Sequence, residues 1–147
     1  MKKRRRGGFT LLEILVVVLI ITILATIVGV NVAKEPGKAR RAKAVAEIQT
    51  FRTALQVYRM EQGGIPTQEQ GLKALCEKPA TGPAPERYPD GGYLDSRAVP
   101  RDPWGHEYVY MTPGANGEPY EIVSYGADGE PGGAGEAEDV SSTPAAR

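Results

Sequence analysis

The feature that most constrains this chain is an apolar run from Phe9 to Val32 whose only charged residue is Glu13. As an α-helix rising about 1.5 Å per residue, a run of this length spans the ~30 Å hydrocarbon core of a bilayer. An ordinary secretory signal has an apolar core of only about 7–15 residues, followed by a small-residue cleavage site. Here the run is longer, and the Gly7-Gly8 pair comes before it. The pattern predicts a membrane-anchoring helix over residues 9–33.

Charge is segregated along the chain. Residues 2–6 supply five of the 18 Lys and Arg residues, and without them 13 basic residues face 18 acidic ones, a net charge of −5. An excess of Lys and Arg marks the cytoplasmic flank of a membrane helix. We therefore expect a single-pass protein with a cytoplasmic N-terminus and an exported C-terminal domain. A nucleic-acid partner is not expected, because such binding needs clustered Lys and Arg on the folded body.

Glu13 is the unusual residue of the run. A carboxylate at the centre of a membrane helix costs about 2.5–3.5 kcal/mol on insertion scales. On the residues alone, one interpretation is a signal anchor with an isolated glutamate. Pairing is much stronger in a low dielectric than in water, and an unpaired buried charge is heavily penalised.

The N-terminal pattern carries a family resemblance. A short basic leader, Gly8 and then Phe9-Thr10-Leu11-Leu12-Glu13 before a long apolar helix resembles the class III signal of type IV pilins and pseudopilins. The resemblance implies that residues 1–8 are a prepilin leader, which prepilin peptidase removes between Gly8 and Phe9 before methylating Phe9 to N-methylphenylalanine. Glu13 would then pair with the new α-ammonium of Phe9, its own or a neighbour's. Such a pair would set the register between stacked helices.

Beyond the apolar run, the sequence predicts a second helical segment. Lys34-Glu35-Pro36-Gly37 should kink or interrupt the helix, and Gly63-Gly64 should end it. Between them, apolar residues recur at spacings of three and four, which indicates an amphipathic helix with its stripe in the core. The stripe consists of Val45, Ile48, Phe51, Leu55 and Tyr58.

The remaining residues predict a small β-structure. Residues 67–75 can form a short helix capped by Thr67 with Leu72 and Leu75 inward, and residues 79–100 should be irregular. Residues 108–111 and 120–125 are rich in β-branched and aromatic side chains, and the Pro/Gly/Asn segment 113–117 between them predicts a hairpin. The expected fold class is α+β: one long N-terminal helix, membrane half then amphipathic half, packed against a small antiparallel sheet.

The body of the chain extends the resemblance. PTQEQGL at 66–72, YPDGGYL at 88–94, DPWG at 102–105 and SYGADGEPGGAGEAED at 124–139 resemble the major pseudopilin family of type II secretion, general secretion pathway protein G. The resemblance implies a pilin-like periplasmic domain over residues 34–140 on an inner-membrane anchor, and residues 141–147 are expected to be a disordered tail. It also implies a subunit that polymerises in the periplasm to drive export of folded proteins through the outer membrane. The implied partners are other copies of the chain, minor pseudopilins, the inner-membrane assembly platform and prepilin peptidase.

Two other functions stay open on the sequence. A type IV pilin of a surface filament shares the N-terminus, but such pilins usually close a loop with a cysteine pair, and Cys76 is alone. A membrane-anchored calcium-binding module that does not polymerise would leave Glu13 without a neighbour's cation. An enzyme is not expected: His106 lies beside Trp104 in a turn, with no catalytic partner at a suggestive spacing, so we predict a structural role for it.

The segment GADGEPGGAGEAEDV, residues 126–140, places carboxylates among glycines. Oxygen ligands on a flexible loop suit a hard cation such as Ca²⁺, although the spacing is not that of an EF-hand. Composition alone favours a solvated acidic loop over a cation site. The resemblance implies a calcium site with side-chain ligands from Asp128 and Asp139 and backbone carbonyls of Tyr125 and Glu130. A further ligand is left open between Glu136 and Glu138, which flank Ala137.

Overall fold

The structure, a computed structural model, describes the backbone of residues 10–32 and 35–143 and the side chains of residues 10–24 and 36–143. The chain forms two compact units, Met1–Pro36 and Gly37–Arg147. The predicted leader and the predicted cleavage site between Gly8 and Phe9 lie outside the described residues.

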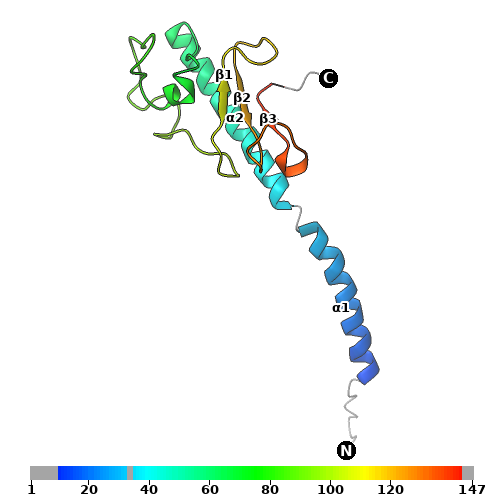
Figure 1. Ribbon diagram of the computed structural model, residues 1–147. Coiled ribbons are helices and arrows are strands. Elements are labelled where there is room, and N and C mark those ends of the chain that lie inside the picture. Colours follow the sequence, from blue (N-terminus) through cyan, green and yellow to red (C-terminus); the bar gives the residue numbers. More distant parts are fainter. Residues whose placement is uncertain (1–9, 33–34, 144–147) are drawn as a thin grey trace, which may run out of the picture. The chain divides into compact units, whose positions relative to one another are not determined.

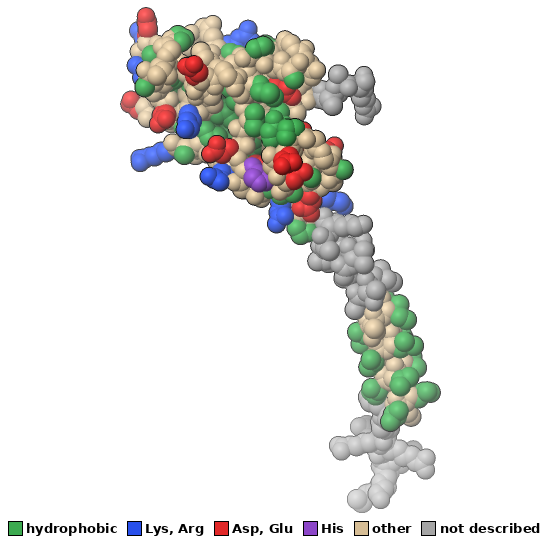
Figure 2. Space-filling model, in the orientation of Figure 1, with side chains coloured by type: hydrophobic (Ala, Val, Ile, Leu, Met, Phe, Trp, Pro, Cys, Tyr) green, Lys and Arg blue, Asp and Glu red, His purple; other side chains and the backbone are tan. Residues whose placement is uncertain are grey.

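Helix α1 spans Leu11–Val32 (Figure 1). Thr10 caps its N-terminus, because the Thr10 Oγ1 atom accepts a hydrogen bond from the Glu13 N–H at 3.2 Å. The described apolar side chains are exposed, from 44% at Val16 to 84% at Leu11, and hydrophobic side chains cover the visible face of this segment in Figure 2. A helix that is apolar on all sides is stable when lipid or other protein covers it.

Within the part of the chain that the structure describes, no helix combines the length and the apolar character needed to cross a membrane.

Helix α2 spans Glu35–Gln62. Pro36 therefore lies in its first turn, where a missing N–H breaks no intrahelical hydrogen bond and the fixed φ suits a helix. The predicted interruption of one long helix agrees with the two separate helices, α1 ending at Val32 and α2 beginning at Glu35; residues 35–37 themselves are helical. The predicted C-terminus is confirmed: Gly63 follows the helix with φ +74°, and its N–H donates to the Arg59 carbonyl at 3.0 Å.

The buried face of α2 forms the core of the second unit. Ile48, Phe51, Leu55 and Tyr58 are all buried, as the spacing predicts. Val45 is 44% exposed, so its predicted place in the core is wrong; the neighbouring Ala44 is buried there instead. The same cluster includes Tyr110, Ile122 and Val140 of the sheet and Tyr108, which directly precedes the first strand.

The sheet has three antiparallel strands in the order β1-β2-β3: β1 is Val109–Met111, β2 is Glu121–Ser124 and β3 is Val140–Ser141. Tyr110 pairs with Ile122, and Val123 pairs with Ser141. The predicted hairpin is confirmed, and the α+β fold class with it. Strand β3 was not predicted, because two residues are too short to give a periodic pattern.

The pairing of β3 also corrects the expected tail. The Ser142 N–H donates to the Ile122 carbonyl at 2.8 Å, and the Thr143 N–H donates to Ser141 Oγ at 3.0 Å. Disorder is therefore the wrong prediction for residues 141–143, since backbone pairing holds them to β2. Residues 144–147 lie outside the described part of the chain.

The predicted short helix near residue 70 is a turn followed by the 3-10 helix η1, Gly71–Leu75. Thr67 and Gln70 form a reciprocal capping box: the Gln70 N–H donates to Thr67 Oγ1 at 3.3 Å, and the Thr67 N–H donates to Gln70 Oε1 at 3.0 Å. Leu72 and Leu75 are buried, as predicted.

One polar contact ties the residue before β1 to α2. The Tyr108 hydroxyl donates to Glu47 Oε2 at 2.5 Å. Burial raises the pKa of the Tyr108 hydroxyl well above its usual value, and the hydrogen bond to Glu47 is a second, smaller cause of the same shift. The hydroxyl therefore stays protonated and remains a donor throughout the physiological range.

Candidate functional site

Residues 126–139, which we call the acidic loop, connect β2 to β3 and contain the 3-10 helix η2, Gly135–Ala137. The loop turns on glycines with positive φ, a conformation that costs an L-residue about 1–2 kcal/mol. These residues are Gly126, Gly129, Gly132, Gly133 and Gly135, with φ between +67° and +100°. The sequence thus lets the backbone make close turns that side chains would obstruct.

The two ends of the acidic loop meet at Gly126. The Ala127 N–H donates to the Glu136 carbonyl at 2.9 Å. A Cβ atom at Gly126 would lie only 2.7 Å from that same carbonyl oxygen. Glycine is required here because both the positive φ and the nearby carbonyl exclude a side chain. The hydrogen bond between Ala127 and Glu136 then closes the loop on itself.

Asp139 carries the polar feature of most interest in the loop. Its Oδ2 atom accepts a hydrogen bond from the Gly132 N–H at 3.0 Å. Its Oδ1 atom is buried and has no hydrogen-bond partner among the described residues. A buried oxygen without a partner lowers the stability of the folded state by about 1–3 kcal/mol, and by more if it is charged. A cation or a hydrogen-bond donor at this position would therefore stabilise the loop.

The other residues predicted as ligands lie along the same loop or at its start. Asp128 is exposed, and its Oδ1 atom accepts from the Glu130 N–H at 3.2 Å. Tyr125 directly follows β2 and is half-buried, whereas Glu130 is exposed. Among the described residues, no group of three or more His, Cys, Asp or Glu side chains is arranged to hold a metal. A cation here would need backbone carbonyls beside the two aspartates.

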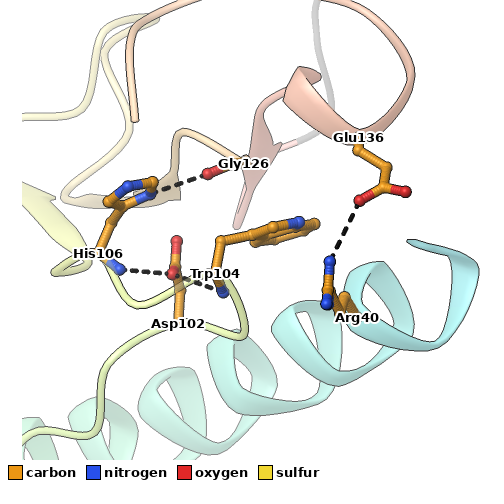
Figure 3. Close-up of polar contacts among 6 residues, drawn as sticks. All are labelled: Arg40, Asp102, Trp104, His106, Gly126 and Glu136. Carbon is orange, nitrogen blue, oxygen red and sulfur yellow. Dashed lines mark hydrogen bonds and ion pairs between the residues drawn. The ribbon is translucent and has the colours of Figure 1, made fainter. Parts of the chain in front are cut away.

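Glu136 and Glu138 face arginines of α2. Glu136 Oε2 lies 3.4 Å from Arg40 Nη1 (Figure 3). Glu138 Oε2 lies 3.3 Å from Arg41 Nη1, which also donates to the Glu138 carbonyl at 3.1 Å. Exposed ion pairs of this kind stabilise by at most about 1 kcal/mol. Their effect is to direct both glutamates toward the helix.

The Glu136 side chain also packs against the start of α2. A Cβ atom at Gly37 would lie 2.6 Å from Glu136 Oε1. The absence of a side chain at Gly37 therefore makes room for the Glu136 carboxylate beside Arg40.

A buried carboxylate that the sequence analysis did not single out supports the start of the loop. Asp102 is 4% exposed. Its Oδ1 atom accepts from the N–H groups of Trp104 at 3.1 Å and His106 at 2.8 Å. Its Oδ2 atom accepts from the Ser124 hydroxyl at 2.5 Å, and Ser124 Oγ accepts in turn from the Gly126 N–H at 3.3 Å.

His106 makes a second connection between this turn and the loop. Its Nδ1 atom lies 2.9 Å from the Gly126 carbonyl oxygen (Figure 3). Since a carbonyl only accepts, Nδ1 carries the proton. A Cβ atom at Gly129 would lie 3.1 Å from the imidazole ring, so the ring packs closely on this glycine. The DPWG motif marked the turn, but no spacing in the sequence showed that it contacts residues 124–129.

Glu13 belongs to the other unit. Its side chain is exposed, and its backbone N–H completes the Thr10 cap. Phe9, its predicted partner after cleavage, lies outside the described residues. The pairing between the Phe9 α-ammonium and the Glu13 carboxylate therefore stays a prediction.

Comparison with known proteins gives consistent matches. The family described as Type II secretion system (T2SS), protein G matches residues 31–143, and the prokaryotic N-terminal methylation motif matches residues 3–29. The chain is 46% identical over 132 residues to type II secretion system core protein G of Aeromonas hydrophila, covering 90% of each chain. It is 43% identical over 139 residues to the protein of the same name from Vibrio cholerae, covering 95% of this chain and 92% of that protein.

A solved structure matches as well. The fold is similar to the crystal structure of the major pseudopilin from the type 2 secretion system of enterohaemorrhagic Escherichia coli, with a TM-score of 0.61 and 36% sequence identity. The match covers 71% of this chain and 87% of that chain.

Substitution of two glycines in the acidic loop tests whether its closure depends on close packing. Gly126 and Gly135 share φ +67°, but only at Gly126 would a Cβ atom meet backbone. Gly135→Ala should lower the free energy of unfolding by about 1–2 kcal/mol, the cost of the left-handed backbone. Gly126→Ala should cost clearly more. Urea unfolding of both variants measures the difference, and equal losses would contradict the packing argument.

Proposed function

The chain belongs to the type II secretion system protein G family and is a structural subunit of the pseudopilus, and we propose that it drives export of folded proteins through the outer membrane. It would do so by polymerising from the inner membrane into the periplasm. The observation that carries this proposal is the match of both segments: the methylation motif over residues 3–29 and the protein G family over residues 31–143.

The proposed position in the cell is a single membrane pass with a cytoplasmic N-terminus and a periplasmic domain. Five cations precede the apolar run, as on the cytoplasmic side of membrane helices. The described apolar side chains of α1 are all exposed within a single chain. Lipid before assembly and neighbouring α1 helices after it would cover them.

The proposed partners follow from the same family. Prepilin peptidase would cut between Gly8 and Phe9 and methylate Phe9. Further copies of the chain, minor pseudopilins and the inner-membrane assembly platform would join the subunit into the filament. Glu13 would pair with a Phe9 α-ammonium in the assembled helices, which offsets the cost of its burial.

We also propose that the acidic loop binds Ca²⁺. Asp139 would contribute its buried Oδ1 atom, which no described donor satisfies, and Asp128 would contribute the second carboxylate. Carbonyl oxygens of Tyr125 and Glu130 would complete an all-oxygen ligand set of the kind that Ca²⁺ prefers. Glu136 and Glu138 are not part of this proposal, because each lies within ion-pair distance of an arginine.

We propose no enzymatic activity for this subunit. Burial raises the pKa of the Cys76 thiol, so the thiol is neutral at physiological pH and a poor nucleophile. The His106 Nδ1 atom is engaged by the Gly126 carbonyl, and the Asp102 carboxylate is occupied by three donors. His106 and Asp102 thus hold the backbone through their hydrogen bonds, which is a structural role and not that of an acid–base pair.

Substitution of Glu13 tests the assembly proposal. Glu13→Ala should still insert and be processed, because alanine lowers the cost of insertion. Filament yield should fall at least about tenfold, since removing one partner of a buried charged pair costs about 2–5 kcal/mol. Filaments are quantified by shearing and electron microscopy, and intact mass reports the loss of residues 1–8 with one added methyl group.

The matched control for this experiment is Glu69→Ala, which removes an exposed carboxylate outside the membrane segment. It should leave both filament yield and processing at wild-type level. Normal filament yield from Glu13→Ala would contradict the pairing argument, and a mature protein that begins near residue 30 would contradict the processing site.

Calcium binding is tested by thermal unfolding of the full chain in detergent micelles. At ten times the dissociation constant, the ion stabilises the folded state by about 1.4 kcal/mol, which raises the melting temperature by about 3–6 °C. Exported modules bind Ca²⁺ with dissociation constants of about 10⁻⁴–10⁻³ M, so about 10 mM CaCl₂ is compared with chelator. Asp128→Asn and Asp139→Asn should each remove most of the rise.

Glu130→Gln is the control within the loop, because the proposed ligand is its carbonyl and the side chain is exposed. This variant should keep most of the calcium effect. A melting temperature of the unmodified chain that does not respond to calcium would overturn the site assignment.

A further inference from the structure

We propose that His106 is a positioning residue for calcium: its imidazole fixes the peptide group at the start of the acidic loop in the orientation that the ion requires. The inference rests on the proposed calcium site. It is carried by the contact of Nδ1 with the Gly126 carbonyl oxygen at 2.9 Å, seen in Figure 3.

Two consecutive peptide groups are fixed at this point. The Gly126–Ala127 peptide is held at its carbonyl by His106 and at its N–H by the Glu136 carbonyl, at 2.9 Å in each case. The preceding Tyr125–Gly126 peptide is held at its N–H by Ser124 Oγ at 3.3 Å. Because a peptide group is planar, fixing the N–H of Gly126 also fixes the direction of the Tyr125 carbonyl, one of the proposed ligands.

By donating from Nδ1, His106 fixes the direction of the Gly126 carbonyl, which is not one of the proposed ligands. Without this donor the Gly126–Ala127 peptide would be held only at its N–H, by the Glu136 carbonyl, and glycine at a φ of +67° has several alternative backbone conformations. Rotation about this residue would carry the Tyr125 carbonyl with it.

The backbone of His106 is itself held on both sides, at its N–H and at its carbonyl. Asp102 accepts the His106 N–H at 2.8 Å, and the Asp102 N–H donates to the His106 carbonyl at 2.8 Å. The ring packs on Gly129, where a Cβ atom would lie 3.1 Å from it. Gly129 lies between Asp128 and Glu130, so the ring supports the backbone that carries two further proposed ligands.

His106 would act on the proposed ligands and would not touch the ion itself. Residues that orient ligands without touching the ion typically change metal affinity by about 10–100-fold when they are replaced. His106 lies outside the apolar core cluster. Replacing it should therefore affect the loop and its ion more than the unfolding of the rest of the domain.

Two substitutions of His106 test the proposal. Asparagine places an amide N–H near the position of Nδ1 and keeps the donor to Gly126, whereas leucine fills similar space over Gly129 without a donor. We titrate CaCl₂ against the melting temperature of the full chain in detergent micelles and derive the dissociation constant from the concentration dependence. Melting in chelator reports the stability of each folded variant without the ion.

The expected result is that His106→Leu raises the calcium dissociation constant at least about tenfold, while His106→Asn stays within about threefold of the unmodified chain. If both variants bind calcium like the unmodified chain, His106 has no positioning role and the inference is overturned while the calcium site stands. If both lose affinity equally, the donor is not what matters, which also overturns it. If the unmodified chain shows no calcium dependence, the inference and the proposed site fail together.

Discussion

The second unit depends on the apolar stripe of one helix, α2. Its strands are only three, four and two residues long, and most of the remaining chain is loop. Such a sheet is not stable by itself and needs a helix to bury its apolar face. Ile48, Phe51 and Leu55 supply that surface, and the aromatic ring of Tyr108 packs edge-on against Phe51 with centroids 5.0 Å apart. The hydrogen bond from Tyr108 to Glu47 fixes the same contact from its polar side.

The acidic loop cannot use this kind of stabilisation, because its exposed glycines and carboxylates bury little apolar surface. Polar contacts replace it: the Asp102 turn holds its start through Ser124 and His106, and arginines of α2 hold η2 near its end. Asp139 Oδ1 remains buried without a partner among the described residues. The proposed calcium ion, with His106 positioning its ligands, would hold the parts of the backbone that the apolar core does not reach.

The sequence predicted what depends on periodicity and on specific local residues. The end of the helix at Gly63, the hairpin and all of the helical stripe except Val45 are as expected, because each is set by neighbours in the chain. Val45 and strand β3 were missed, since both depend on which side chains the rest of the domain covers or pairs. The same holds for the site: Asp128 and Asp139 were visible as carboxylates among glycines, but the contacts from Asp102 and His106 join residues about 20 positions apart.

Hydrogen exchange of backbone amides, followed with calcium and with chelator, tests most directly whether an ion orders the loop. The amides of Ala127, Glu130 and Gly132 make hydrogen bonds within the loop, to the Glu136 carbonyl, Asp128 and Asp139 respectively. If calcium binds Asp128 and Asp139, these amides should exchange more slowly in calcium, while amides near the middle of α2 should change little. Identical exchange of the loop amides in both conditions would contradict this account.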